Sequence, residues 1–194
     1  MIRSLVVGVI ALISVACLMV DGGQETGPEQ FDFDMRPGTG PGEEAERLAA
    51  GVIADTDTLT AADHVVWVPT PLGRIDVVDT LVVSDGTEFS CRALIADPFS
   101  SQACGDGFPE IPPTQIEMDG ISSDGEWTLV EVRAGQGIRA LRAQAADGTV
   151  YRSDVVRGVG ILVYPVNRGS LTIQGLGANE EPEGEPVTAG EPLP

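Results

Sequence analysis

The chain has 194 residues, enough for one medium-sized domain, and its 30 acidic and 11 basic residues give a formal net charge of −19. Every basic residue is an arginine, and His64 is the single histidine. This composition excludes nucleic-acid binding through clustered Lys and Arg, lysine-dependent chemistry such as Schiff bases, and histidine-rich metal sites.

An unbroken apolar run from Leu5 to Val20 follows Arg3 and ends at Asp21. A helix over this run would be about 24 Å long, which is short for a bilayer core and long for the apolar region of a signal peptide. We therefore expect residues 1–20 to be a signal peptide, a lipoprotein signal or a membrane anchor. The arginine before the run and the acids after it predict that the remainder of the chain lies outside the membrane.

The end of the apolar run carries a cleavage signal. Residues 13–17, ISVAC, resemble a bacterial lipobox, in which Cys17 would be lipidated and become the mature N-terminus. The segment departs from that pattern at Ser14, where a large aliphatic residue is usual. Lipoprotein, uncleaved signal anchor and secreted protein therefore all stay open.

Two acidic flanks enclose the predicted domain. Residues 21–46 are rich in Gly and Pro and carry eight acids and one Arg, which predicts a flexible linker. Residues 178–194 hold five acids, several prolines and no basic residue, which predicts a disordered tail. Residues 47–177 form the expected extracytoplasmic domain, and a short helix or turn is expected near Glu43 to Ala50 at its start.

From His64 onward the pattern is that of β-strands. The clearest hairpin joins Ile75–Val83 to Thr87–Ile95 through an Asp-Gly turn. Alternation in the second strand predicts that Cys91 and Ala93 face inward and that Arg92 faces outward.

Further strands are expected in the second half of the domain. Residues 138–145 would also fit a helix, but the Asp-Gly turn that follows them favours a strand. The other expected strands are Trp127–Val132, Thr149–Val156, Ile161–Tyr164 and Leu171–Leu176. Together these segments predict an all-β fold, an immunoglobulin-like sandwich or partly open barrel of about seven or eight strands.

Cys91 and Cys104 are the two cysteines that follow the apolar run. An even pair in an exported protein is most simply a disulfide, and closing this loop should stabilise the fold by about 3 kcal/mol. Two thiols with one histidine are too few for a typical zinc site, and the spacing is not that of a redox motif.

The order of these features resembles uncharacterised exported domains of high-GC bacteria, actinobacteria especially. The resemblance covers residues 48–176 and rests on CRAL at 91–94, the following Cys104-Gly105, and the later segments WTLVEV at 127–132, AADGT at 145–149 and GILV at 160–163. Strand density is also similar to that of immunoglobulin-like sandwiches, although Trp127 follows both cysteines rather than lying between them. The resemblance implies no activity and no functional residue.

Candidate catalytic and metal sites are sparse. Asp63-His64 is the one acid–histidine neighbour pair, and Ser90, Ser100 or Ser101 would have to supply a nucleophile, without any Gly-x-Ser-x-Gly elbow. We expect His64 to be a half-exposed structural residue. The short glycine motifs at residues 135–137 and 158–160 lack a dinucleotide-binding context and are typical of turns or bulges.

Acidic and aromatic residues leave weaker alternatives. The pairs Asp55 with Asp57, Asp76 with Asp79, and Asp119 with Asp124 could serve glycosidase or calcium chemistry, but turns and surfaces explain them better. A carbohydrate platform would need two aromatic rings exposed on one face, whereas Trp67, Trp127, Tyr151 and Tyr164 all lie in expected strands, where packing in the core is usual.

These observations favour a non-enzymatic binding or structural module of the cell envelope, without cofactor or bound metal. Its partner would be a protein or another envelope component, contacted by strand edges and by a loop from Asp97 to Ala103 with Phe99 as candidate anchor. The alternatives are a carboxylate-dependent hydrolase acting on envelope polymers and a binder of calcium or a small ligand.

Export can be tested on intact producing cells. Because the chain beyond residue 20 is expected outside the membrane, added protease should degrade the domain before the cells are lysed. Protection until lysis would contradict this prediction. If Cys17 is lipidated, Cys17→Ser should release the protein or leave its precursor uncleaved.

Overall fold

The computed structural model describes residues 30–31, 36–38, 42–53, 58–107 and 109–190. The expected signal or anchor at residues 1–20, including Cys17, lies outside these residues. Within the described part of the chain, no helix is both long enough and apolar enough to cross a membrane.

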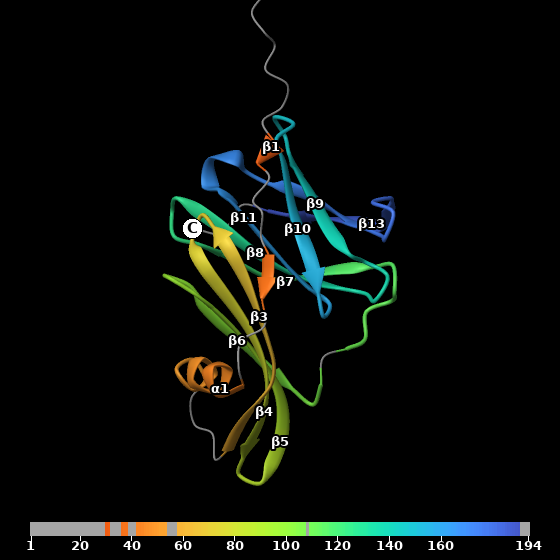
Figure 1. Cartoon of the computed structure of the whole chain (residues 1–194). Coiled ribbons are helices and arrows are strands. Elements are labelled where there is room, and N and C mark those ends of the chain that lie inside the picture. The colour runs from red at the N-terminus through yellow and green to blue at the C-terminus, as the bar shows by residue number, and fades with distance from the viewer. Residues whose placement is uncertain (1–29, 32–35, 39–41, 54–57, 108, 191–194) are drawn as a thin grey trace, which may run out of the picture.

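The fold consists of two β-sheets that pack against each other, and Figure 1 shows one sheet below the other. The first sheet has the order β2-β3-β4-β5-β6. Its strands are β2 (Arg36–Gly38), β3 (Thr58–Thr70), β4 (Gly73–Ser84), β5 (Thr87–Ala96) and β6 (Ser100–Gly105), and helix α1 (Gly42–Ala50) precedes β3.

The second sheet is a curled half-barrel with the order β13-β12-β9-β10-β11-β8-β7, and its end strands β13 and β7 come into contact. The short β1 (Gln30–Phe31) pairs in parallel with β10. The other strands are β7 (Ile116–Ser123), β8 (Trp127–Ala134), β9 (Ala140–Ala145), β10 (Val150–Val156), β11 (Val159–Pro165), β12 (Leu171–Leu176) and β13 (Pro182–Ala189), and the 3-10 helix η1 (Val166–Arg168) lies between β11 and β12. This architecture confirms the predicted all-β class.

The predicted hairpin is confirmed as β4 and β5, which pair from Ile75 with Ala96 to Ser84 with Thr87. Its turn residues Asp85 and Gly86 have φ angles of 51° and 70°. Both angles are positive, as in the tight turns that match the twist of paired strands. Residues 140–145 are confirmed as a strand, because β9 pairs with β10 on one side and β12 on the other.

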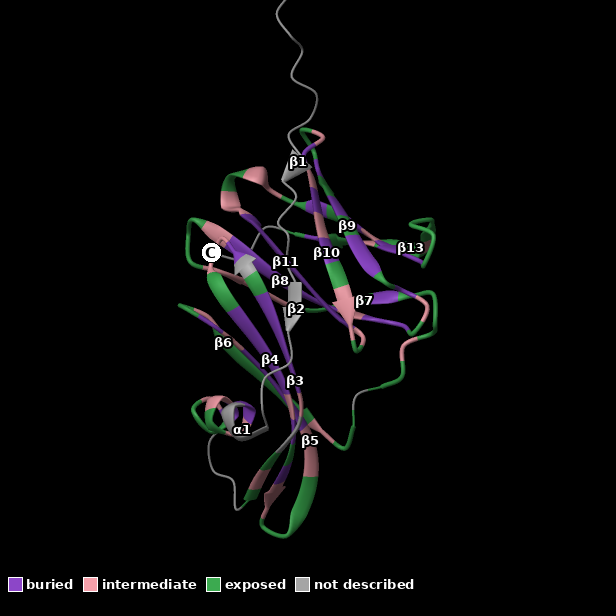
Figure 2. Cartoon of the chain, viewed as in Figure 1, coloured by how far each residue is buried: buried purple, intermediate pink, exposed green. Residues whose placement is uncertain are grey.

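The first sheet is covered on both faces, which Figure 2 shows as buried residues along the middle of its strands. On one face, Cys91 and Ala93 of β5 pack with Ala45 and Ala49 of α1. The other face packs against the second sheet through a shared apolar layer, formed by Val65, Trp67, Ile75, Val77, Leu94, Ala96, Leu129, Val159, Ile161 and Val163. A second cluster fills the half-barrel around Leu141, Tyr151 and Tyr164.

Because both faces of the first sheet are covered, the prediction that Arg92 faces solvent is wrong. The outward face of a two-stranded hairpin would leave Arg92 in solvent, but the second sheet covers that face and the residue is only 8% exposed. Sequence alternation identified the two faces of β5 correctly, but it could not show that both are buried.

The acidic tail was predicted as disordered from residue 178, yet residues Pro182–Ala189 form β13 against β12. A sheet edge needs mainly backbone hydrogen bonds, and the Gln174 side chain adds one by donating to the Glu183 carbonyl at 2.8 Å. Ala189 is fully buried. Composition alone therefore underestimated how well this segment could pair.

Two other boundaries also differ from the predictions. The segment predicted as a linker, residues 21–46, includes strand β2 and the start of α1. Helix α1 confirms the short helix expected near Glu43 to Ala50. The loop predicted from Asp97 to Ala103 ends sooner, because β6 begins at Ser100 and pairs with β5. A hydrogen bond from the Ala96 amide to the Phe99 carbonyl at 2.7 Å closes the turn between them.

The predicted disulfide is present. Cys91 and Cys104 lie directly opposite each other on β5 and β6, and a disulfide joins them. Cys91 is buried under α1, whereas Cys104 is exposed on the edge strand. The bond therefore ties the edge of the first sheet to its core.

Reduction of this disulfide should lower the melting temperature by several degrees, since a closed loop of this size contributes about 3 kcal/mol in the chain-entropy model. Thermal unfolding with and without reductant measures the effect. The double variant Cys91→Ala with Cys104→Ala is the control and should no longer respond to reductant. Equal melting temperatures for the oxidised and reduced wild type would contradict the prediction.

Candidate functional site

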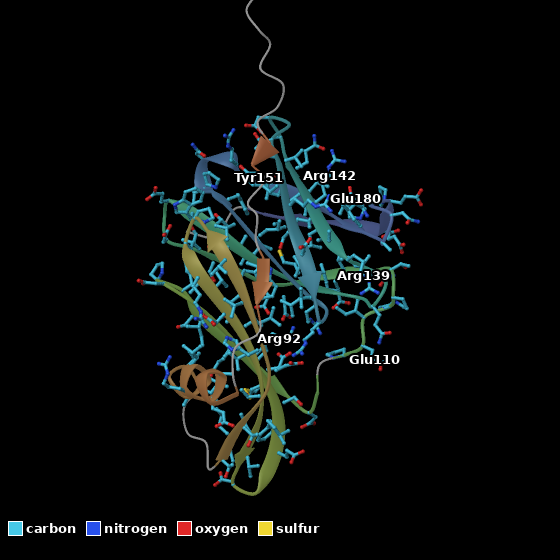
Figure 3. All side chains as sticks on the ribbon, viewed as in Figure 1. Arg92, Glu110, Arg139, Arg142, Tyr151 and Glu180 are labelled. Carbon is cyan, nitrogen blue, oxygen red and sulfur yellow. A yellow bond between two sulfur atoms is a disulfide. The ribbon has the colours of Figure 1, made fainter. Side chains whose placement is uncertain are left out.

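A cleft of about 950 Å³ lies near the junction of the two sheets. A volume of this size lies within the range of ligand-binding pockets. The cleft is lined by Arg92 of β5, the segment 109–113 that leads to β7, residues 133–136, 138 and 139 around the β8–β9 connection, and residues 155, 157 and 158 at the β10–β11 turn. Figure 3 labels Arg92, Glu110 and Arg139 among these residues.

One side of the cleft is built by close backbone packing. The amides of Gly135 and Gly137 donate to the carbonyls of Gln115 and Pro113 at 2.9 and 2.8 Å. A Cβ atom at Gly135 would lie 2.0 Å from the Pro112 carbonyl oxygen, so only glycine fits there. The motif at residues 135–137 therefore fixes the proline-rich segment to the half-barrel and gives the cleft a firm wall.

Four of the eleven arginines line this cleft, although the chain as a whole has a net charge of −19. They are Arg92, Arg133, Arg139 and Arg157, and Glu110 is the one acidic residue among the lining residues that the structure describes. The four come from separate places in the chain, so the fold, rather than a local sequence cluster, gathers them.

A regular switch from apolar to charged residues brings these groups together. The faces that meet between the sheets read Ile75, Val77, Asp79 on β4 and Ala96, Leu94, Arg92 on β5. On β8 the same face reads Leu129, Glu131, Arg133. Each strand is apolar where it joins the shared layer and charged further along, so a charged cluster borders the layer where Arg92 and Arg133 enter the cleft.

Arg92 links the two sheets within this cluster. Its Nε donates to Asp79 Oδ1 at 2.7 Å, and its Nη1 lies 4.0 Å from Glu131 Oε1 of the second sheet. Burial disfavours the charged guanidinium, but the hydrogen bond and charge of Asp79, with the charges of Glu131 and Asp119, outweigh it and raise the pKa of Arg92. Arg92 is therefore a fixed cation at the inner end of the cleft.

Arg133 and Arg157 are also held by carboxylates. Arg133 Nη2 donates to Glu117 at 3.0 Å, and its Nε lies 3.1 Å from Asp119 Oδ1. Arg157 pairs with Asp63 of the first sheet. Arg157 also has a φ of 52°, a conformation that is uncommon for residues other than glycine, in the β10–β11 turn.

Arg139 differs from the other three arginines. Its side chain is exposed, and it forms no ion pair or side-chain hydrogen bond among the described residues. Arg133 likewise keeps a buried Nη1 that no described protein group accepts from. The exposed guanidinium of Arg139 therefore offers donors to the cleft that no described group of the protein accepts from.

Glu131 lies beside the cleft in the charged cluster and is 6% exposed. Its Oε1 atom is buried without a hydrogen-bond partner in the described structure. Burial, with smaller contributions from the charges of Asp119 and Asp79, outweighs the attraction of Arg92 and Arg133 and raises the pKa of Glu131 to about 7. The Glu131 carboxyl is therefore much harder to ionise than an exposed glutamate.

The structure does not bring together the triad considered for His64. His64 is 4% exposed rather than half-exposed, and its Nε2 lies 2.6 Å from Asp76 Oδ1, not beside Asp63. Arg74 also pairs with Asp76 at 2.6 Å. No described hydrogen bond joins His64 to Ser90, Ser100 or Ser101.

The structure describes two of the three candidate carboxylate pairs, and their members have different partners. Asp76 and Asp79 lie on opposite faces of β4, the first bound to His64 and Arg74 and the second to Arg92. Asp124 accepts hydrogen bonds from the amides of Glu126 and Trp127 as a turn residue. Asp55 and Asp57 lie outside the described residues, and within those described no group of three or more His, Cys, Asp or Glu is arranged to hold a metal ion.

The aromatic candidates serve the fold. Trp67, Tyr151 and Tyr164 are buried, and Trp127 and Phe99 are half-buried against the layer between the sheets. Phe99 thus has only part of its ring available to a partner, and its role as an anchor stays a prediction. No pair of exposed rings that would form a carbohydrate platform is found among these residues.

Sequence reasoning missed the arginine cleft, although a signal for it exists. In β5 and β8, charged residues continue the two-residue spacing of a face that is otherwise apolar. Arg92 lies two residues before Leu94, and Glu131 lies two residues after Leu129. A charged residue at such a position has to be paired when a second layer covers it. Only the topology shows which layer that is.

Comparison of the chain with protein-family models, with curated proteins and with solved structures finds no match. No residue role is therefore carried over from another protein to this cleft.

The raised pKa of Glu131 predicts a specific dependence of stability on pH. A carboxyl whose folded pKa exceeds its unfolded value stabilises the fold below the unfolded pKa and loses that contribution as pH rises through the folded pKa. Folding raises the pKa of Glu131 from 4.5 to about 7. Between pH 5 and 8 the free energy of unfolding of the wild type should therefore fall by on the order of 3 kcal/mol.

Glu131→Gln should remove most of this slope, so the variant should melt several degrees higher than the wild type at pH 8. Thermal unfolding across the pH range measures it. Glu88→Gln, at an exposed position in the β4–β5 hairpin, is the control and should keep the slope of the wild type. Parallel pH curves for Glu131→Gln and the wild type would contradict the assignment.

Proposed function

We propose that the chain is an exported, membrane-associated module of the cell envelope that binds another envelope component through the arginine-lined cleft, and that it has no catalytic role. The observation that carries this proposal is the convergence of Arg92, Arg133, Arg139 and Arg157 on one cleft in a strongly acidic chain. The apolar run at residues 5–20 supports the expected location outside the membrane.

The geometry of the cleft suits binding. Its wall is held by backbone contacts at Gly135 and Gly137, and three of its arginines are fixed by carboxylates before any ligand arrives. Groups that are already ordered lose little conformational entropy when a ligand binds. A cleft of this kind therefore suits partner recognition better than the surface turn at Asp97 to Phe99 does.

The alternative is a carboxylate-dependent hydrolase, and the raised pKa of Glu131 is the observation that favours it. A buried carboxyl with a pKa near 7 could act as a general acid. However, Glu131 is not among the residues that line the cleft, and its carboxylate neighbours Asp79 and Asp119 are paired with arginines. Turnover of an envelope polymer that disappears in Glu131→Gln would favour this alternative over the binding module.

Photo-crosslinking in producing cells tests the proposed function. A photoreactive residue in place of Gln136, which is exposed in the cleft, should form an adduct with an envelope component that mass spectrometry can identify. The same residue in place of Gln144, exposed on β9 outside the cleft, is the matched control and should not form that adduct. The proposal fails if both positions give the same adducts or if position 136 gives none.

A further inference from the structure

The side-chain donors of the cleft that no described residue accepts from belong to arginine, a cation. Asp79 pairs with Arg92, Asp63 with Arg157 and Glu117 with Arg133. Arg139, which is exposed, has no ion pair or side-chain hydrogen bond among the described residues. Guanidinium groups have donors only, so a group that satisfies them must bring acceptors. The ligand therefore carries an anionic or strongly polar oxygen where it meets Arg139.

The neighbouring acids favour a carboxylate over a phosphate. Glu110 lines the cleft, and Glu117, Asp119 and Glu131 lie beside its arginines. A dianionic phosphate would meet this negative charge at close range, whereas a carboxylate carries a single charge and matches a guanidinium in a planar, two-bond arrangement. The protein itself already uses this kind of pairing at Asp79 and Arg92.

The rest of the lining favours a peptide over an acidic polysaccharide. Ile111, Ile138 and Val155 lie in the cleft beside the prolines of segment 109–113, and the described lining residues include no aromatic ring. Branched aliphatic side chains suit the aliphatic side chains of a peptide, and recognition of sugars commonly adds the flat face of an aromatic residue. The apolar contacts would thus lie next to the points where carboxylates bind.

We propose that the ligand of the cleft is an acidic segment of another envelope protein, in which an Asp or Glu side chain binds Arg139 and neighbouring aliphatic side chains pack against Ile111, Ile138 and Val155. This inference rests on the proposed function, because it names the chemistry of the partner for the same cleft. The overall negative charge of the chain does not oppose it strongly, since charges beyond about 8 Å are largely screened at physiological salt.

Fluorescence anisotropy of the full chain tests the inference with a short labelled peptide that alternates Glu and Leu. A counterpart peptide with Gln in place of Glu should bind much more weakly. Raising the salt concentration should lower the affinity of the acidic peptide. Arg139→Gln should reduce the affinity about tenfold, as expected for loss of a hydrogen bond to a charged group. Because Arg139 is exposed and has no side-chain partner among the described residues, the variant should fold normally, which its melting temperature checks.

Arg142→Gln is the matched control. Arg142 is exposed on β9, lies outside the cleft and gives the same change in net charge, so this variant should bind as the wild type does. Glu110→Gln should act in the opposite direction and strengthen binding, because it removes an acid from the lining. Equal losses for Arg139→Gln and Arg142→Gln would overturn the inference, since they would indicate attraction by general charge alone.

Two other outcomes would also overturn it. The first is competition by inorganic phosphate or polygalacturonate, added so that the concentration of phosphate or carboxylate groups matches that of the peptide's carboxylates. Displacement of the peptide would show that the cleft does not select a peptide. If the acidic peptide fails to bind while the adduct at position 136 is still formed in cells, the cleft binds a partner of different chemistry. That result would leave the proposed function standing and remove the inference about its ligand.

Discussion

The fold depends on the apolar layer that joins the two sheets. Trp67 and Ile75 of the first sheet are fully buried against Ile161 and Val163 of the second. Burial of apolar area contributes roughly 25 cal/mol per Å², and neither sheet could keep this face in water. The layer also fixes the distance between the sheets, so it determines where the charged residues beyond its border meet.

Those charged residues show why the border is built from arginine. A buried cation needs several acceptors in fixed directions, and the guanidinium of Arg92 reaches Asp79 on its own sheet and Glu131 on the other. Attraction in a partly buried site is strong, but so is the cost of desolvation. At Glu131 the cost of desolvation exceeds the attraction, because burial raises the pKa of its carboxyl despite two nearby arginines.

The sequence was most informative where local patterns decide the structure. The Asp85-Gly86 turn specified the β4–β5 hairpin, and the turn at Asp147 favoured a strand over residues 138–145, of which 140–145 form β9. The expectation of export favoured the Cys91–Cys104 disulfide. Each of these depends on neighbours in the chain or on the compartment.

The candidate site was not predictable in the same way. Arg92, Arg133, Arg139 and Arg157 meet because strands from two sheets come together, and Asp76 rather than Asp63 is the partner of His64 because of the β3–β4 register. The acidic segment 182–189 was expected to be disordered from its composition, but the free edge of β12 gave it a strand to pair with. Long-range pairing of this kind leaves no periodic signal.

The two short N-terminal strands divide their contacts between the sheets. β1 pairs with β10 of the half-barrel, and β2 pairs with β3 of the first sheet. A pulling force on the chain before residue 30 would therefore load β1 first and reach the first sheet only through β2. With two and three residues, these strands would separate well before the long β3–β4–β5 ladder and the disulfide that ties β6 to it. Under such a load these two strands would detach first, while the two sheets and the cleft near their junction stay folded.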